Sequence, residues 1–160
     1  VMSKGIVTTA KVTPISIAPT TLGQIVVQDA DESYYLSETE EKKFAYLRGS
    51  KRIPRKDANG FEYMYSEGAM SPFDDLSMPG RTMLTSEGTV NRSTHIIKDP
   101  VTNRMRYLTP VECERLNQFP DNWTNYGMPD KRRYFMMGNA LVCGIVKKLG
   151  VEIDRIISAE

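Results

Sequence analysis

The sequence predicts an α+β protein with a small, irregular, mostly antiparallel sheet followed by two or three C-terminal helices. Short alternating segments between turn formers, such as FEYMY at 61–65 and THII at 94–97, are typical of strands. Capping signals and apolar stripes at helical spacing gather after residue 108. With 160 residues, 40% apolar and 26% charged, the composition is that of one ordinary folded domain.

Residues 1–22 alternate Thr, Ser and Pro with aliphatic residues and show little helical period, which predicts either a strand pair or an extended connector. A helix is expected from Ser37, because Ser37 followed by Glu40 forms a capping box and Phe44 and Leu47 lie one turn apart. Gly49 is expected to end this helix.

Charge is strongly segregated around this helix, although the formal net charge is only +1. Residues 29–41 contain only acidic charges, and residues 42–56 contain only basic ones. A basic block interrupted by Gly49 and Pro54 can follow a phosphate backbone, and the alternative is a solvated charged face. Residues 50–60 combine turn formers and charge without periodicity, so we expect a mobile surface loop.

The middle of the chain predicts short strands joined by turns. After the strand at 61–65, residues 66–80 predict a loop, RTMLT at 81–85 a strand, and SEGTVNRS at 86–93 a turn-rich segment. The strand THII follows, and KDPVTNRM is expected to join it to MRYL as a hairpin.

The strongest helix start is at Thr109, which is followed by Pro110 at the first helical position and by Glu112 as the capping-box partner. Pro120 is expected to end that helix. Asp130 is expected to cap a second helix over 131–136, and Asn139 a third. The third helix carries an apolar stripe from Leu141, with Gly150 as a C-cap or kink and more apolar residues beyond it.

Several functional classes are excluded by composition. Cys113 and Cys143 lie 30 residues apart without a CxxC pair, and His95 is the only histidine, so we expect no metal site, no disulfide and a structural His95. No stretch approaches 18 consecutive apolar residues, and the first residues lack the order of a secretory signal. A cytoplasmic protein without membrane contact is therefore expected.

Two C-terminal segments carry a specific resemblance. RYLTPVECERLNQFPDNW at 106–123 and GNALVCGIVKKLG at 138–150 resemble the ninth and tenth motifs of bacterial DNA cytosine-5 methyltransferases. The ninth motif implies residues that brace the target-recognition domain and do no chemistry. These structural residues are Arg106, Thr109, Pro110, Glu112, Arg115, Phe119 and Pro120. The tenth implies that Gly138, Asn139 and Ala140 lie beside the methionine part of S-adenosylmethionine, whereas a plain helix cap is the alternative from the residues alone.

RTMLTSEGTVNRSTHII at 81–97 resembles the end of a target-recognition domain, where a loop enters the major groove. The residue types suit base reading, since Arg92 can recognise guanine, Asn91 adenine and Glu87 the cytosine amino group. Gly88 lets the backbone approach a base edge. A polar hairpin turn is the alternative. The DNA-binding residues expected here are Arg81, Thr82, Ser86, Glu87, Gly88, Asn91 and Arg92; those expected to grip phosphates are Arg48, Lys51, Arg52, Arg55 and Lys56.

The segment 34–70 further resembles the front of the recognition domain in a restriction-modification subgroup, so the resemblance extends over residues 20–153. It implies a DNA target-recognition domain at 23–108, after the connector or strand pair at 1–22, and a helical segment at 109–160 that would complete a methyltransferase catalytic domain.

The chemistry of that family is missing from the sequence. There is no Pro-Cys pair for the nucleophile, no Phe-x-Gly-x-Gly turn for the methyl donor and no Glu-Asn-Val segment. Neither Cys113 nor Cys143 has the flanking residues of the nucleophile that adds to a flipped cytosine. We therefore expect no catalytic residue here and no methylation by this chain alone.

The resemblance predicts a recognition portion, either an excised piece or the smaller subunit of a split enzyme. Its partners would be double-stranded DNA and the catalytic N-terminal half or large subunit, and S-adenosylmethionine would bind only with that half. The alternatives are an autonomous DNA-binding module and a structural domain without a DNA role. The apolar stripe after Leu141 must pack on the catalytic half, fold back or form a homodimer.

Overall fold

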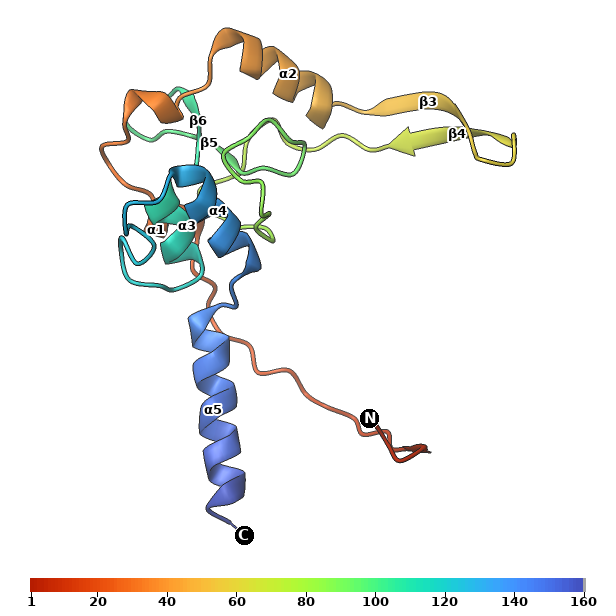
Figure 1. The fold of residues 1–160 in the computed structure, drawn as a ribbon, viewed down its shortest axis with the longest axis vertical. Helices are drawn as coiled ribbons and strands as arrows, with labels where there is room; N and C mark the ends of the chain where they lie inside the picture. Colours follow the sequence, from red (N-terminus) through yellow and green to blue (C-terminus); the bar gives the residue numbers. More distant parts are fainter. Residues whose placement is uncertain (160) are drawn as a thin grey trace.

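The computed structural model describes residues 1–159, in which a helical body carries three projections (Figure 1). The body contains α1 (Leu22–Ile25), a 3-10 turn (Glu32–Tyr34), β5 (Ile96–Lys98), β6 (Met105–Tyr107), α3 (Pro110–Leu116) and α4 (Asp130–Asn139). The projections are the N-terminal segment with β1 (Met2–Ser3) and β2 (Ile6–Val7), the hairpin β3 (Lys51–Lys56) and β4 (Glu62–Glu67) that follows α2 (Glu38–Arg48), and α5 (Cys143–Ile157).

The α+β class is confirmed. Each of the three sheets among residues 1–159 is an antiparallel pair, β1 with β2, β3 with β4, and β5 with β6. Both alternatives for the N-terminal segment are present, because a very short hairpin is followed by an extended run up to α1. The expected hairpin from THII to MRYL is the β5–β6 pair.

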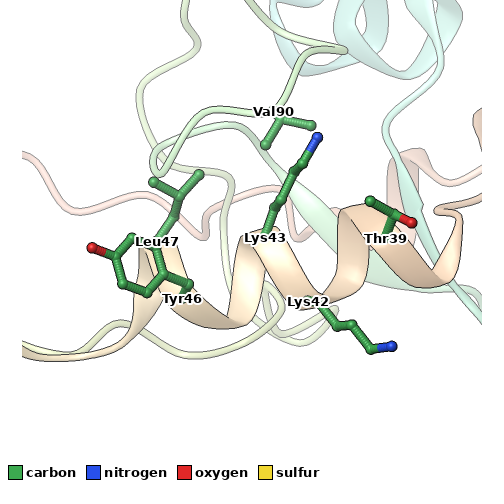
Figure 2. A pocket seen from close by; sticks show the side chains of 6 residues that line it. All are labelled: Thr39, Lys42, Lys43, Tyr46, Leu47 and Val90. Carbon is green, nitrogen blue, oxygen red and sulfur yellow. The ribbon is translucent and has the colours of Figure 1, made fainter.

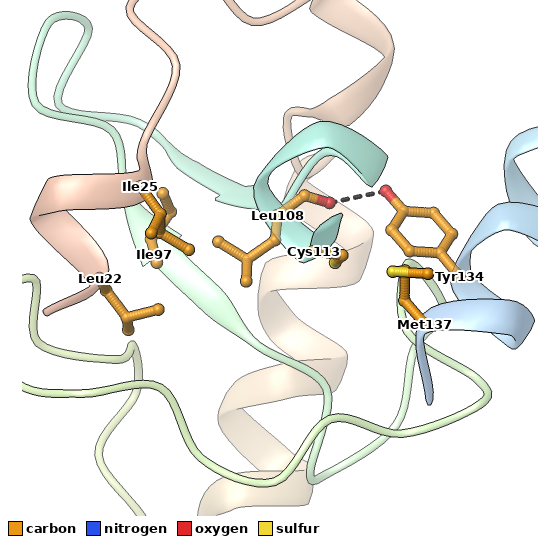
Figure 3. Close-up of a cluster of buried hydrophobic side chains, with 7 residues drawn as sticks. All are labelled: Leu22, Ile25, Ile97, Leu108, Cys113, Tyr134 and Met137. Atoms are coloured by element: carbon orange, nitrogen blue, oxygen red, sulfur yellow. Dashed lines mark hydrogen bonds between the residues drawn. The ribbon is translucent and has the colours of Figure 1, made fainter. Parts of the chain in front are cut away.

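The core lies on both sides of this β5–β6 pair. Ile97 belongs to a buried cluster with side chains from α1, α3 and α4, which Figure 3 shows. Its members are Leu22, Ile25, Ile97, Leu108, Cys113, Tyr134 and Met137. The neighbouring Ile96 belongs to a second cluster with Leu36, Phe44 and Tyr107. Successive strand residues point to opposite faces, so one strand attaches α2 to the C-terminal helices.

Helix α3 begins as the sequence predicts. The Thr109 hydroxyl accepts from the backbone N–H of Glu112 at 3.2 Å, and the Glu112 carboxylate accepts from the N–H of Thr109 at 2.6 Å. The same carboxylate binds the buried Arg106, whose other acidic partner is Asp99 at 2.7 Å. Burial by itself would raise the pKa of Asp99, but hydrogen bonds from Thr102, Arg106 and Val101 lower it to about 2.

Two segment predictions are wrong. Most of the range 50–60 is a strand and not a loop, because 51–56 pair with 62–67 along their whole length and only 57–60 form the turn. Pro54 lies opposite Met64 in an isolated two-stranded hairpin, where proline is tolerated. Residues 81–85 form no strand. Arg81 turns inward to the carboxylate of Asp74 at 2.6 Å, and the backbone beside it pairs with no neighbouring strand.

The helix boundaries after residue 129 also differ from the prediction. Asp130 is the first residue of α4 and Pro129 is its cap. Asn139 ends α4 and does not cap α5, because its side-chain amide donates back to the carbonyl of Phe135 at 2.9 Å. Helix α5 begins after Val142 and runs through Gly150, which neither ends nor kinks it. A mid-helix glycine costs about 1 kcal/mol, which the surrounding helix formers outweigh.

Candidate nucleic-acid interface and cofactor edge

A buried ion-pair network on the inner side of the segment 81–95 holds its backbone in place. Arg48 is 2% exposed and donates to the carbonyls of Ser71 and Thr94 and to Asp74. Arg81 binds the same carboxylate of Asp74 through two nitrogens, at 2.6 and 3.1 Å. Both arginines were expected on DNA phosphates or bases. In the structure the guanidinium group of Arg48 is buried and that of Arg81 is partly buried, and both bind Asp74 and backbone carbonyls of the loop.

Glu87 is also turned inward and is 2% exposed. Its carboxylate accepts from the backbone N–H of His95 at 2.9 Å, pairs with His95 Nδ1 at 2.9 Å and accepts from the N–H of Leu84 at 3.2 Å. A carboxylate with these three partners cannot reach a cytosine amino group without unfolding its own turn. In this structure the Glu87 carboxylate is used within the chain and does not face outward as the expected base contact requires; it closes the turn 84–87 on the fully buried His95.

Arg92 connects the loop to the base of the hairpin. Its guanidinium donates to the carbonyls of Leu47 and Gly68 and pairs with Glu67 at 3.0 Å. The bidentate fork needed for guanine is therefore occupied within the chain. Thr82 and Asn91 remain exposed, Ser86 and Gly88 are half-buried, and Gly88 has a positive φ of 71°.

A groove runs between α2 and the tip of this loop, and Figure 2 shows its lining. The groove has a volume of about 530 Å³ and is lined by Thr39, Lys42, Lys43, Tyr46, Leu47 and Val90. Lys43 points toward Val90, whereas Lys42 points away and pairs with Glu38 at 2.5 Å. Lys43 and Tyr46 were not among the predicted DNA-binding residues. Their three-residue spacing on the predicted helix was the available signal.

The hairpin neutralises half of its own basic strand. Lys51 pairs with Glu67 at 3.1 Å and Lys56 with Glu62 at 3.4 Å, because the antiparallel register places acids of β4 opposite lysines of β3. Arg52 and Arg55 have no acidic partner among residues 1–159, and the Arg55 guanidinium lies 4.0 Å from the centre of the Tyr65 ring. Two of the five predicted phosphate contacts are thus exposed and uncommitted.

The predicted cofactor residues divide between two surfaces. Gly138 and Ala140 line a cavity of about 270 Å³ together with Arg81 and Thr82. The rest of the lining is mainly apolar, from Met83, Leu116, Met137 and Val142. Asn139 is exposed outside this cavity. Small residues in a mainly apolar lining leave room for the methionine end of an S-adenosylmethionine molecule, and nothing in residues 1–159 forms the strand-turn-helix that grips its adenosine.

The ninth-motif residues brace the body. Arg115 pairs with Asp121 at 2.6 Å and donates to the carbonyl of Ile25 at 2.9 Å, which ties α3 to α1. The Phe119 ring lies 6.2 Å from that of Trp123, next to Pro120. Pro110 is buried at the start of α3.

Neither cysteine has the surroundings of a nucleophile. Cys113 is fully buried, and burial together with the carboxylates of Glu87, Glu112 and Glu114 raises its pKa well above that of a free thiol. Cys143 is half-buried in the first turn of α5. Within residues 1–159 no cluster of His, Cys, Asp and Glu could hold a metal, and no helix is long and apolar enough to cross a membrane.

Comparisons with known proteins agree on one family. Residues 8–155 match the family model described as C-5 cytosine-specific DNA methylase. The chain is 48% identical over 158 residues to the type II methyltransferase M.Sau3AI of Staphylococcus aureus, a match that covers 99% of this chain and 38% of that protein. The solved structure of the Entamoeba histolytica methyltransferase EhMeth is similar with a TM-score of 0.51 over 86% of this chain and 43% of the other; at 17% identity this likeness concerns the fold.

Proposed function

The chain belongs to the C-5 cytosine-specific DNA methylase family, and we propose that it is the DNA target-recognition portion of such an enzyme together with its last two motifs. In this proposal residues 23–108 bind duplex DNA, and residues 109–160 join them to a catalytic half that this chain does not contain. The chain spans about two-fifths of the length of its curated relative, which supports the proposal that an active enzyme requires the rest.

The observation that carries the proposal is the combination of a family match over residues 8–155 with the absence of a usable nucleophile. The family reaction needs a thiolate beside a flipped base. Cys113 is buried in the core, and Cys143 is half-buried in the first turn of α5. We infer that the thiolate comes from the other half, and that this chain is inactive by itself.

The DNA-facing surface that the geometry favours combines three neighbouring parts. Arg52 and Arg55 on the hairpin supply uncommitted guanidinium groups for phosphates, and Lys43 supplies an ammonium group from α2. The exposed loop residues Thr82 and Asn91 have the chemistry for base edges. Arg48, Arg81, Glu87 and Arg92 hold this loop in shape and leave the reading to its exposed residues.

S-adenosylmethionine supplies the methyl group in this family. In the assembled enzyme Gly138 and Ala140 would form one wall beside its methionine end, with Met83 and Met137 excluding water. The catalytic half would hold the adenosine. The chain's own contribution is to place the target cytosine within reach and to close one edge of the pocket.

Binding in a salt series tests the proposal. We would measure the affinity of this chain for duplexes that it selects from a randomised pool, with and without the part of M.Sau3AI that it does not cover. Selective binding with a steep salt slope only in the presence of that part is expected for an obligate portion. Selective binding by the chain alone would favour an autonomous DNA-binding module. Binding in neither condition would contradict the proposal.

A further inference from the structure

One face of α4 contacts the turn at 84–88 along two successive helical turns. Tyr134 and Gly138 are four residues apart, so they lie above one another on the same side of the helix. Both meet the segment that leads into the proposed DNA-reading loop. Tyr134 is 5% exposed, and its hydroxyl is anchored to the carbonyl of Leu108 at 2.6 Å, which fixes the ring (Figure 3).

Gly138 leaves no room for a side chain. A Cβ atom at this position would overlap the backbone of Leu84 and Thr85, well inside van der Waals contact. The obstructing atoms are the carbonyl group of Leu84 and the nitrogen of Thr85, so no side-chain rotation could relieve the overlap. The whole loop backbone would have to move away from α4.

Gly88 makes the second contact of this docking. A Cβ atom on Gly88 would overlap the Tyr134 ring, and the positive φ of 71° at Gly88 also favours glycine. Between these two contacts, the buried Glu87 carboxylate holds the N–H groups of Leu84 and His95. The turn is therefore held on one side by α4 and on the other by His95.

We infer that Gly138 is a positioning residue for DNA recognition: it allows α4 to seat the turn 84–88, and through that turn it sets the loop that presents Thr89, Val90 and Asn91. This role differs from contact with the cofactor, and it rests on the proposed function for its effect on DNA. Gly138 also lines the proposed cofactor cavity with Ala140. The same glycine therefore connects this cavity to the base-reading loop.

The single histidine provides a direct probe of the contact between α4 and the turn 84–88. His95 is fully buried against Glu87, and it is the only histidine, so the chain gives one set of imidazole nuclear magnetic resonance signals. We would compare the unmodified chain with Gly138→Ala and with Gly150→Ala as the matched control. Gly150 is also a helical glycine, but a Cβ atom there meets nothing within 4 Å.

Gly138→Ala is expected to shift the imidazole signals of His95, and Gly150→Ala is expected to leave them unchanged. Unshifted signals in a folded Gly138→Ala chain would overturn the inference. If that variant does not fold, amide hydrogen exchange of the unmodified chain decides. The N–H groups of Leu84, Glu87 and His95 should then exchange no faster than those of α4, and faster exchange would show that α4 does not seat the turn.

The effect on DNA is measured separately, as the ratio of the affinities for a selected and a scrambled duplex. The measurement is made with or without the rest of M.Sau3AI, whichever condition gives selective binding in the salt series. Gly138→Ala should lower this ratio about tenfold, the value of one misplaced base contact, and leave the affinity for the scrambled duplex unchanged. An unchanged ratio with shifted His95 signals would overturn the role in recognition. If the unmodified chain binds no DNA in any condition, the proposed function fails, whereas the His95 signals still decide whether Gly138 positions the loop.

Discussion

Arg48 and Arg52 lie four residues apart in one basic segment, yet their surroundings are opposite. Arg48 ends α2 and turns into the body, where three acceptors bind it, whereas Arg52 lies on the hairpin and remains exposed. Burial lowers the pKa of Arg48, and Asp74 partly offsets this effect. A formal count of positive charge therefore overstates the number of residues that can bind phosphate.

Arg52→Ala and Arg55→Ala should each weaken DNA binding to all sequences alike. Each lost phosphate contact should reduce the slope of log affinity against log salt by about 0.9. Fluorescence anisotropy over a salt series measures this slope. Lys56→Ala is the matched control, because Lys56 is already paired with Glu62 and should change the slope less. Equal effects from the three variants would mean that the hairpin acts only through its total charge.

Asp99→Asn should destabilise the fold in a pH-dependent manner. The folded-state pKa of Asp99 is depressed to about 2 from an ordinary value of 3.8, so its contribution is present above pH 3.8 and is lost as the pH falls toward 2. The shift corresponds to roughly 2 kcal/mol at neutral pH. Urea unfolding at several pH values should show a gap between variant and unmodified chain that closes between pH 4 and pH 2. A gap that stays constant over this range would contradict the lowered pKa of Asp99.

At the scale of elements, two features decide what the surface can bind. Antiparallel pairing brings the acidic residues of β4 opposite the lysines of β3, so the hairpin presents arginines and aromatic rings more than bulk positive charge. Helix α5 projects from the body (Figure 1), and its large apolar residues are between 47% and 64% exposed. A helix with such a stripe is stable in water only when another surface covers it.

The triple variant Ile145→Gln, Leu149→Gln, Ile153→Gln should abolish the association of the chain with a catalytic half. These residues lie four apart on one face, and burying three such side chains is worth at least about 4 kcal/mol, or roughly a thousandfold in affinity. Isothermal titration calorimetry with the part of M.Sau3AI that this chain does not match measures the loss of affinity. Lys147→Gln with Asp154→Gln alters the opposite face and should have little effect.

The same triple variant also separates the two candidate partners of α5. If sedimentation shows that the unmodified chain forms a dimer and the variant does not, a second copy covers the stripe. An unchanged affinity for the catalytic part would exclude α5 from the interface between the two halves.

At the scale of the whole molecule, the chain has a core of its own, whereas the proposed function places the rest of the active site on another part of the enzyme. The clusters around Ile96 and Ile97 join α2 to the C-terminal helices, so the loop at 81–95 is held from several directions. The N-terminal segment and α5, in contrast, expose apolar side chains such as Ile15 and Leu149. Their exposure agrees with a match that covers 38% of the relative's length.

The chain alone should transfer no methyl group from labelled S-adenosylmethionine to DNA, and a mixture with the catalytic part should do so. In that mixture Cys143→Ala should keep the rate within about twofold, since a residue that is not the nucleophile contributes little to the barrier. Scintillation counting of the DNA measures both rates. Methylation by the isolated chain, or its loss in Cys143→Ala, would contradict a nucleophile supplied from outside.

The sequence by itself determined the features that depend on neighbouring residues. The capping boxes at Ser37 and Thr109 and the β5–β6 hairpin follow from local spacing, because the groups that stabilise them lie within a few residues of each other. The family also followed from the sequence, since the motifs at 106–123 and 138–150 are contiguous.

Only the tertiary structure decided which polar residues face outward. Arg48, Glu87 and Arg92 have the same residue types as DNA-reading side chains, but their partners Asp74, His95 and Glu67 are 8 to 26 residues away. The range 50–60, predicted as a loop, contains a strand because 51–56 pair with the strand 62–67 that follows. Burial and long-range pairing are properties of the folded chain, and no local spacing encodes which acid or carbonyl will occupy a given guanidinium group.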